Sequence, residues 1–441
     1  MSINQKKDLS VIKMFINQEK SGGIVLGISV LIALFIANSS FAEDYFHFLE
    51  HKIGFHFDKT SFLEYTIHEW VNDGLMAIFF FVIGIELKRE FISGEFTNLR
   101  NAILPVAAAI GGMVVPSIIF LLLNPSGEPH QGWGIPMATD IAFSLGVLYL
   151  LGNRIPLSLK VFLTALAIVD DLGAVLVIAF FYTSEISITN LLIGLGFVII
   201  MFIGNRLGIR NLIFYAILGI GGVWIAFLLS GIHATIASVL AAFTIPANVK
   251  IIEKVYTDKI EDRLNDFKTL DPNGLPTLTE EQLHVLEEIK DYTNDAIPPL
   301  QRLEYIIHPI VTFIIIPIFA LANAGISLSV DFDTLFNNHI ALGVGLGLLL
   351  GKPIGIMLCT YLCIKFKIAI FPENMNFKNI LGVSLLAGIG FTMSLFITSL
   401  AFSNELFINQ AKIGILVASI ISGFLGYIVL AKSNKKAIIN T

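Results

Sequence analysis

The chain contains few charged residues and almost no cysteine. Of its 441 residues only 14% are charged, whereas 55% are hydrophobic and the mean hydropathy is +0.80. Such usage lies far outside that of soluble globular domains and predicts a polytopic membrane protein. The two cysteines, Cys359 and Cys363, are four residues apart in one apolar segment, so we interpret them as packing residues rather than a redox pair.

The motifs of several functional classes are also missing. No block of lysine and arginine indicates nucleic acid, and no GxxxxGK[ST] loop indicates a nucleotide partner. The sequence offers no thiolate or histidine cluster for zinc or copper, so we expect no cofactor. The first twenty residues are polar and the first apolar run is long enough to span a membrane, so we expect no cleavable signal peptide.

Apolar runs of spanning length predict an all-α membrane protein with about twelve transmembrane helices. They lie near residues 21–39, 71–92, 101–123, 135–151, 158–182, 187–205, 211–229, 231–246, 305–325, 338–364, 379–402 and 408–431. Most of the 28 lysines and arginines fall in loops on the side of the N-terminus. Because positive charge marks the inner side, both termini are predicted to be cytoplasmic.

The predicted organisation has five parts. These are a cytoplasmic segment 1–20, helices one to eight in 21–246, a cytoplasmic loop 247–299, helices nine to twelve in 300–432, and a cytoplasmic tail 433–441. Within the loop, Thr279 to Gln282 forms a capping-box pattern that predicts an amphipathic helix with Leu283, Leu286, Ile289 and Tyr292 near one face. We interpret it as a surface helix packed under the membrane domain, with a partner-binding helix as the alternative.

Two consecutive aspartates, Asp170 and Asp171, lie in the middle of the apolar run from Val161 to Tyr182. A charge at the bilayer centre costs about 2.5–3.5 kcal/mol even on lenient scales, and such residues mark ion or proton pathways. Carboxylate oxygens suit hard cations such as sodium, and a buried carboxyl group can hold a proton instead. Competition of sodium and protons for the same carboxylates predicts antiport.

Two predicted helices are interrupted. Pro136 and the Thr139-Asp140 pair break 135–151, and Gly388 and Gly390 divide 380–402. Each is the middle member of a three-helix group, 101–182 or 338–431, as an inverted repeat of a transporter would require. Broken helices expose backbone ends that need charge compensation, and Asp140 and Lys352 are the available charges.

Lys352 is the one cation that lies well inside a predicted span. A buried lysine must find an acid or lose its proton. The structural interpretation is an ion pair with Asp170 or Asp171, and the functional interpretation is a proton carrier; the sequence leaves both open.

Seven short motifs occur in order along the chain: NDGLM (72–76), GIELKRE (84–90), Thr139-Asp140, AIVDDLG (167–173), FALANAG (319–325), GKP (351–353) and GIGFTMS (388–394). Together they resemble the NhaA-type sodium/proton antiporters of bacterial inner membranes. Members of that family are themselves built from inverted repeats. The repeat prediction and the resemblance therefore do not support the fold independently of each other.

The resemblance implies which residues act. Asp170 and Asp171 would bind sodium or protons with Thr139 beside them, and Asp140 and Lys352 would compensate two crossed, broken helices. It further implies an electrogenic antiporter of sodium or lithium, exchanging about two protons per sodium. A pH-responsive cluster would comprise Glu86, Arg89, Glu90, Glu304 and His308, together with a separate His233.

Two further features follow from the resemblance. The segment from about Phe46 to Phe62 would form an extracellular β-hairpin that pairs across a homodimer, with Gly54 as its turn. Membrane lipid would be the other partner. A sodium-coupled symporter of an organic solute stays open as the alternative, because a fold does not settle a substrate.

Overall fold

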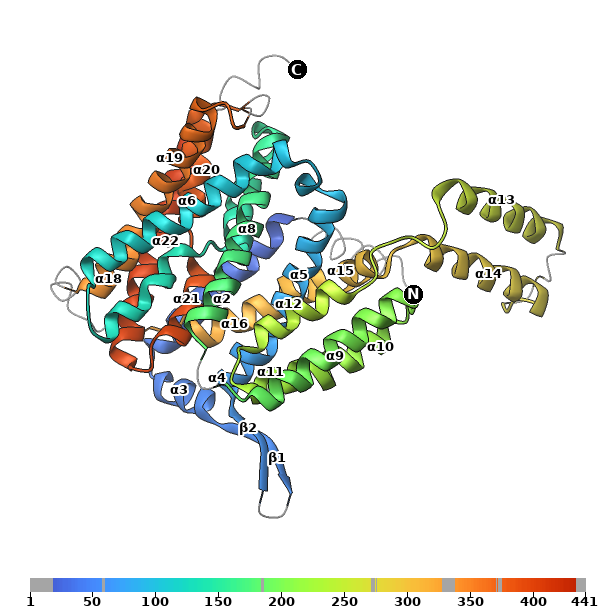
Figure 1. The fold of residues 1–441 in the computed structure, drawn as a ribbon, viewed down its shortest axis with the longest axis horizontal. Helices are drawn as coiled ribbons and strands as arrows, with labels where there is room; N and C mark the ends of the chain where they lie inside the picture. The colour runs from blue at the N-terminus through green and yellow to red at the C-terminus, as the bar shows by residue number, and fades with distance from the viewer. Residues whose placement is uncertain are drawn as a thin grey trace.

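The computed structural model describes residues 19–57, 60–183, 186–270, 274, 276–326, 338–369, 371 and 375–433. Within them, nine helices are long and apolar enough to cross a membrane, and two bent pairs raise the number to eleven. The shorter apolar helix α12 (Ala234–Thr244) corresponds to the remaining predicted span. Figure 1 shows a bundle of helices from which a β-hairpin and a pair of helices project. The predicted all-α polytopic fold is therefore confirmed.

The elements run in the following order. They are α2 (Glu19–Ala37), α3 (Ala42–Glu50), β1 (Lys52–Phe57), β2 (Thr60–Thr66), α4 (Ile67–Glu69), η1 (Trp70–Leu75), α5 (Met76–Ser93), η2 (Glu95–Thr97), α6 (Leu99–Leu123), η3 (Glu128–Met137), α7 (Ile141–Leu150), η4 (Gly152–Arg154), α8 (Leu157–Phe181), α9 (Ile188–Arg206), α10 (Leu212–Ala216), η5 (Ile217–Trp224), α11 (Ile225–Ser230), α12, α13 (Glu253–Thr269), α14 (Glu280–Ala296), α15 (Pro299–Ile310), η6 (Val311–Ile315), α16 (Ile316–Asn323), α18 (His339–Leu346), η7 (Gly347–Gly351), α19 (Lys352–Lys365), α20 (Phe377–Ala387), α21 (Phe391–Ala401) and α22 (Glu405–Ser433).

Both predicted interruptions are present. The 3₁₀ segment η3 ends at Met137, and α7 begins only after the extended residues 138–140. Helices α20 and α21 meet at a 45° bend across residues 388–390. Each break falls in the middle member of its three-helix group, as predicted.

Close helix packing holds these groups together. A Cβ atom added to Gly355 in α19 would lie 1.9 Å from the main-chain oxygen of Gly111 in α6. Only residues without a side chain allow two membrane helices to approach this closely. The span α18–η7–α19 also contains a π-helical turn, η7, that ends immediately before Lys352. Such turns redirect the side chains that follow them, and they recur at functional sites.

The β-hairpin differs from the prediction in its details. Helix α3 occupies the first part of the predicted segment, and β1 pairs with β2 in antiparallel register. Gly54 lies at an irregularity in β1 between Ile53 and Phe55, so its assignment to the turn is wrong. A Cβ there would lie 2.6 Å from the Glu64 Cα, which explains why a glycine occupies this irregular position in the strand.

The loop 247–299 forms a helical hairpin of α13 and α14 that projects from the bundle (Figure 1). The predicted capping box of Thr279 and Gln282 at the start of α14 is confirmed. The expectation that this helix packs under the membrane domain is not met, because its partner is α13, joined by an Arg263–Glu288 ion pair of 3.1 Å. Leu283 consequently remains 49% exposed.

Candidate functional site

Asp140 joins the two interrupted segments. Its Oδ1 accepts a hydrogen bond from the Phe143 N–H at 2.9 Å, at the start of α7. Its Oδ2 accepts from the N–H and the hydroxyl of Thr392 at 2.9 and 2.6 Å, at the start of α21. One buried carboxylate thus faces the positive ends of two helices, where a negative charge is stabilising.

Hydroxyl groups cap carbonyl groups across the same crossing. Ser144 in α7 donates to the carbonyl of Leu386 at the end of α20, at 2.8 Å. Ser394 in α21 donates to the carbonyl of Ile135 in η3, also at 2.8 Å. The Asp140 N–H reaches the Ile389 carbonyl at 2.7 Å. Each broken segment therefore satisfies the free backbone groups of the other.

Lys352 and Asp170 form a fully buried ion pair. The Lys352 ammonium donates to Asp170 Oδ2 and to the Thr139 hydroxyl oxygen. Thr139 Oγ1 lies 2.6 Å from Asp170 Oδ2 and 2.9 Å from the Ala387 carbonyl, so its single proton serves one of the two. Of the partners considered from the sequence, Lys352 contacts Asp170.

Asp171 has a different environment. It is 1% exposed, and its Oδ1 has no hydrogen-bond partner among the described residues. Successive residues of a helix point about 100° apart, and the ammonium of Lys352 bonds Asp170 rather than Asp171. Asp170 Oδ1 likewise has no hydrogen-bond partner among the described residues, but Asp170 Oδ2 is held by Lys352 and Thr139. Of these two neighbouring aspartates, Asp170 is therefore the one in the ion pair.

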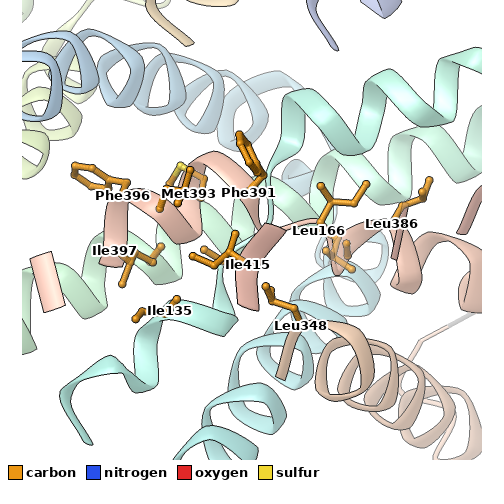
Figure 2. Close-up of a cluster of buried hydrophobic side chains, with 14 of the residues drawn as sticks. Ile135, Leu166, Leu348, Leu386, Phe391, Met393, Phe396, Ile397 and Ile415 are labelled. Atoms are coloured by element: carbon orange, nitrogen blue, oxygen red, sulfur yellow. The ribbon is translucent and has the colours of Figure 1, made fainter. Parts of the chain in front are cut away.

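An apolar shell surrounds this group of polar residues. Figure 2 shows Leu386 and Phe391 on either side of the break between α20 and α21, with Leu166 and Leu348 nearby. All four side chains are at most 4% exposed. Because such a shell keeps the local dielectric low, charges inside it interact more strongly than they would in water.

Some of the residues expected to respond to pH lie together where α5 and α15 meet. Arg89 lies 3.2 Å from a carboxylate oxygen of Glu90 and 3.4 Å from one of Glu304. Glu86 interacts electrostatically with these same three side chains. His308 is exposed on α15, four residues after Glu304.

His233 lies at the other end of the bundle, directly before α12. Its Nε2 is 2.8 Å from the Tyr182 carbonyl, which follows α8. The hydroxyl of Tyr182 also donates to the Gln131 carbonyl, so this contact connects three elements.

Two contributions were not foreseen from the sequence. Ser144 was not singled out from the sequence. It could have been found as a polar residue four positions after Asp140 within an apolar run. Lys88 was given no role of its own beyond its place in the GIELKRE motif, yet its ammonium donates to the Phe243 carbonyl at 2.7 Å and to that of Ile245. It therefore caps the C-terminal end of α12.

The geometry defines a class of protein. Two interrupted membrane helices cross around buried carboxylates and a lysine, which is the architecture of a secondary ion transporter.

Comparison with known proteins gives the family. Residues 13–430 match the family model "Na+/H+ antiporter 1", so the chain belongs to this family of sodium/proton antiporters. The chain is 47% identical over 423 residues to Na(+)/H(+) antiporter NhaA 2 of Syntrophotalea carbinolica, covering 96% of each chain. It is 45% identical to NhaA of Oleidesulfovibrio alaskensis and 44% identical to NhaA of Christiangramia forsetii, each over 96% of this chain and 94% of the relative. The predicted family is confirmed.

Proposed function

We propose that the chain is an electrogenic, pH-regulated antiporter that exports sodium or lithium in exchange for about two protons. The observation that carries this proposal is the pair of buried carboxylates Asp170 and Asp171. Lys352 holds Oδ2 of Asp170, and the Oδ1 atom of each aspartate has no hydrogen-bond partner among the described residues. The names of the relatives favour antiport and give the symporter no support.

The exchange follows from competition for oxygen atoms. A sodium ion without its water needs several oxygen ligands, which Asp171, Asp170 and the Thr139 hydroxyl can supply. For sodium to bind, one proton leaves Asp171 and a second leaves the Asp170–Lys352 pair. Protonation of both on the opposite side displaces the ion again.

This stoichiometry moves one net charge in each cycle, because two protons enter for one sodium that leaves. A membrane potential then contributes about 2.3 kcal/mol per 100 mV to transport. Asp140 stays in place throughout as the compensating charge of α7 and α21.

The remaining features belong to the same proposal. Glu86, Arg89, Glu90, Glu304 and His308 set the pH response at the cytoplasmic mouth, and His233 contributes at the outer end. The protein works as a homodimer in lipid of a bacterial inner membrane, with both termini and the segments 1–20, 247–299 and 433–441 in the cytoplasm.

Proton flux in proteoliposomes tests the proposal. Sodium, lithium or potassium is added across a pH series while a dye reports the membrane potential. We expect proton movement and a potential with sodium or lithium but not with potassium, and loss of both in Asp170→Asn and Asp171→Asn. Antiport retained in either variant would reject the site, and flux without a potential would reject the two-proton stoichiometry.

A further inference from the structure

Three aromatic rings lie one helical turn away from the crossing. Phe396 of α21 packs on Phe80 of α5 at 5.5 Å between ring centroids and on Phe319 of α16 at 6.3 Å. All three side chains are fully buried. Phe396 (labelled in Figure 2) follows Thr392 by four residues, or about 6 Å along the helix. We name these three residues the aromatic layer.

Three polar side chains form a second layer. His68 of α4 has its Nε2 3.0 Å from Asn323 Oδ1, and Asn323 Nδ2 donates to Asn72 Oδ1 at 2.9 Å. Asn323 Nδ2 also reaches the Phe319 carbonyl at 3.0 Å, which connects the two layers. Asn72 and Asn323 are only 6% and 1% exposed. We name His68, Asn72 and Asn323 the polar layer.

The two layers follow one another between the crossing and the β-hairpin. The span α4–η1–α5 begins directly after β2, so His68 and Asn72 lie nearer to the hairpin than Phe80 does. Asn323 ends α16, four residues or about 6 Å beyond Phe319. From the crossing outward, the order is therefore Thr392, the aromatic layer, the polar layer and the hairpin.

The backbone near Asn72 is also irregular. Asn72 lies within η1, a π-helical turn, where an added residue in the turn changes the direction of the side chains. The hydrogen bonds of the polar layer join η1 to α16, whereas Phe396 belongs to α21, the helix that Asp140 caps. The layers thus meet where the crossing helices border α5 and α16.

We infer that the polar layer is a latch that keeps the hairpin end of the ion path closed above the aromatic layer. An antiporter must open its site at one end at a time. The aromatic layer stands between the crossing and the polar layer, so ions that leave toward the hairpin would have to pass it. Asn323 Nδ2 bonds the main-chain carbonyl of Phe319 in the same helix, which ties the polar layer to the helix that carries one of the three rings. The inference uses the proposed antiport only for this requirement of alternating access.

Cysteine accessibility tests the latch independently of transport. Met76, 1% exposed, is the first residue of α5 and lies along the chain between Asn72 of η1 and Phe80 of α5, so Met76→Cys reports whether the space between the layers opens. The background is the full-length chain with Cys359→Ala and Cys363→Ala, in native vesicles treated with a membrane-impermeant thiol reagent. Labelling of Ile53→Cys, 57% exposed in the hairpin, establishes the side to which the reagent is added.

We expect Asn323→Leu and His68→Leu each to raise the labelling rate of Met76→Cys about fivefold or more. That ratio corresponds to about 1 kcal/mol, the net contribution of one hydrogen bond. His68→Gln should restore slow labelling, because its amide can donate from nearly the same place as the imidazole Nε2. Tyr45→Phe is the matched control, since it removes a hydrogen bond to the Leu321 carbonyl of α16 outside the polar layer.

Unchanged labelling in His68→Leu would overturn the latch, even if Asn323→Leu fails to fold. An equal rise in Tyr45→Phe would also overturn it, because any loosening of α16 would then have the same effect. A rise confined to the polar layer, reversed by His68→Gln, supports the inference whether or not the variants transport sodium.

Discussion

Replacing Asp140 by asparagine should destabilise the protein more than its conservative size suggests. The carboxylate accepts three hydrogen bonds, from the Phe143 N–H and from the N–H and hydroxyl of Thr392. An asparagine has one acceptor oxygen, so its amide nitrogen must face at least one of these donors. A buried hydrogen bond to a charged group contributes about 1.5–3 kcal/mol. Loss of the charge beside two helix N-termini adds up to about 2 kcal/mol.

We therefore expect Asp140→Asn to lower the free energy of unfolding by about 3–5 kcal/mol. The assay is reversible unfolding in mixed micelles, with circular dichroism following the helical signal. Asp171→Asn is the matched control, because Asp171 Oδ1 has no partner to lose among the described residues, and it should stay within about 1 kcal/mol of wild type. If both variants lose the same stability, the proposed role of Asp140 as a double helix cap is refuted.

Three further outcomes can be checked. Gly355→Ala should prevent folded protein from accumulating, because its Cβ would lie 1.9 Å from a main-chain oxygen of α6. Gly345→Ala in the same span should be tolerated, because the nearest atom to its Cβ would be 3.8 Å away. Size-exclusion profiles of the two variants test this difference. Lys352→Met should cost about 3–5 kcal/mol in the same unfolding assay, since it strands the buried charge of Asp170, and an unaltered midpoint would contradict this. Thr279→Ala should destabilise α14 by about 1 kcal/mol in hydrogen exchange without altering antiport, and reduced antiport would connect that helix to transport.

The sequence predicted those parts of the fold that depend on composition along the chain. Twenty apolar residues in a row can only span a membrane as a helix, because lipid offers no partners for backbone groups. Charged residues within such a run indicate a break or a site, which located Asp140 and Asp170 correctly within the fold. Glycine is less specific: Gly388 marks a break, whereas Gly111 and Gly355 mark close helix packing.

Features that depend on distant partners could not be predicted in this way. The contact between Asn72 and Asn323 joins residues 251 positions apart. In the sequence, each looks like the polar residues that commonly occur near helix ends. Helix α13 was missed because its charged residues leave no clear apolar face. The irregularity at Gly54 was taken for a turn because glycine occurs in both.

The contacts at the crossing limit how alternating access can occur. Ser144, Thr139 and Ser394 each place a hydroxyl within hydrogen-bond distance of a carbonyl of the opposite broken segment, and Asp140 caps both. Separating these segments would leave several buried polar groups unpaired, each at about 1–3 kcal/mol. A movement that keeps the crossing intact avoids that cost and instead breaks contacts at its border. The aromatic layer is such a border, since Phe396 moves with α21 while its two partners belong to α5 and α16. Transport should therefore depend more on contacts around the crossing than on changes within it.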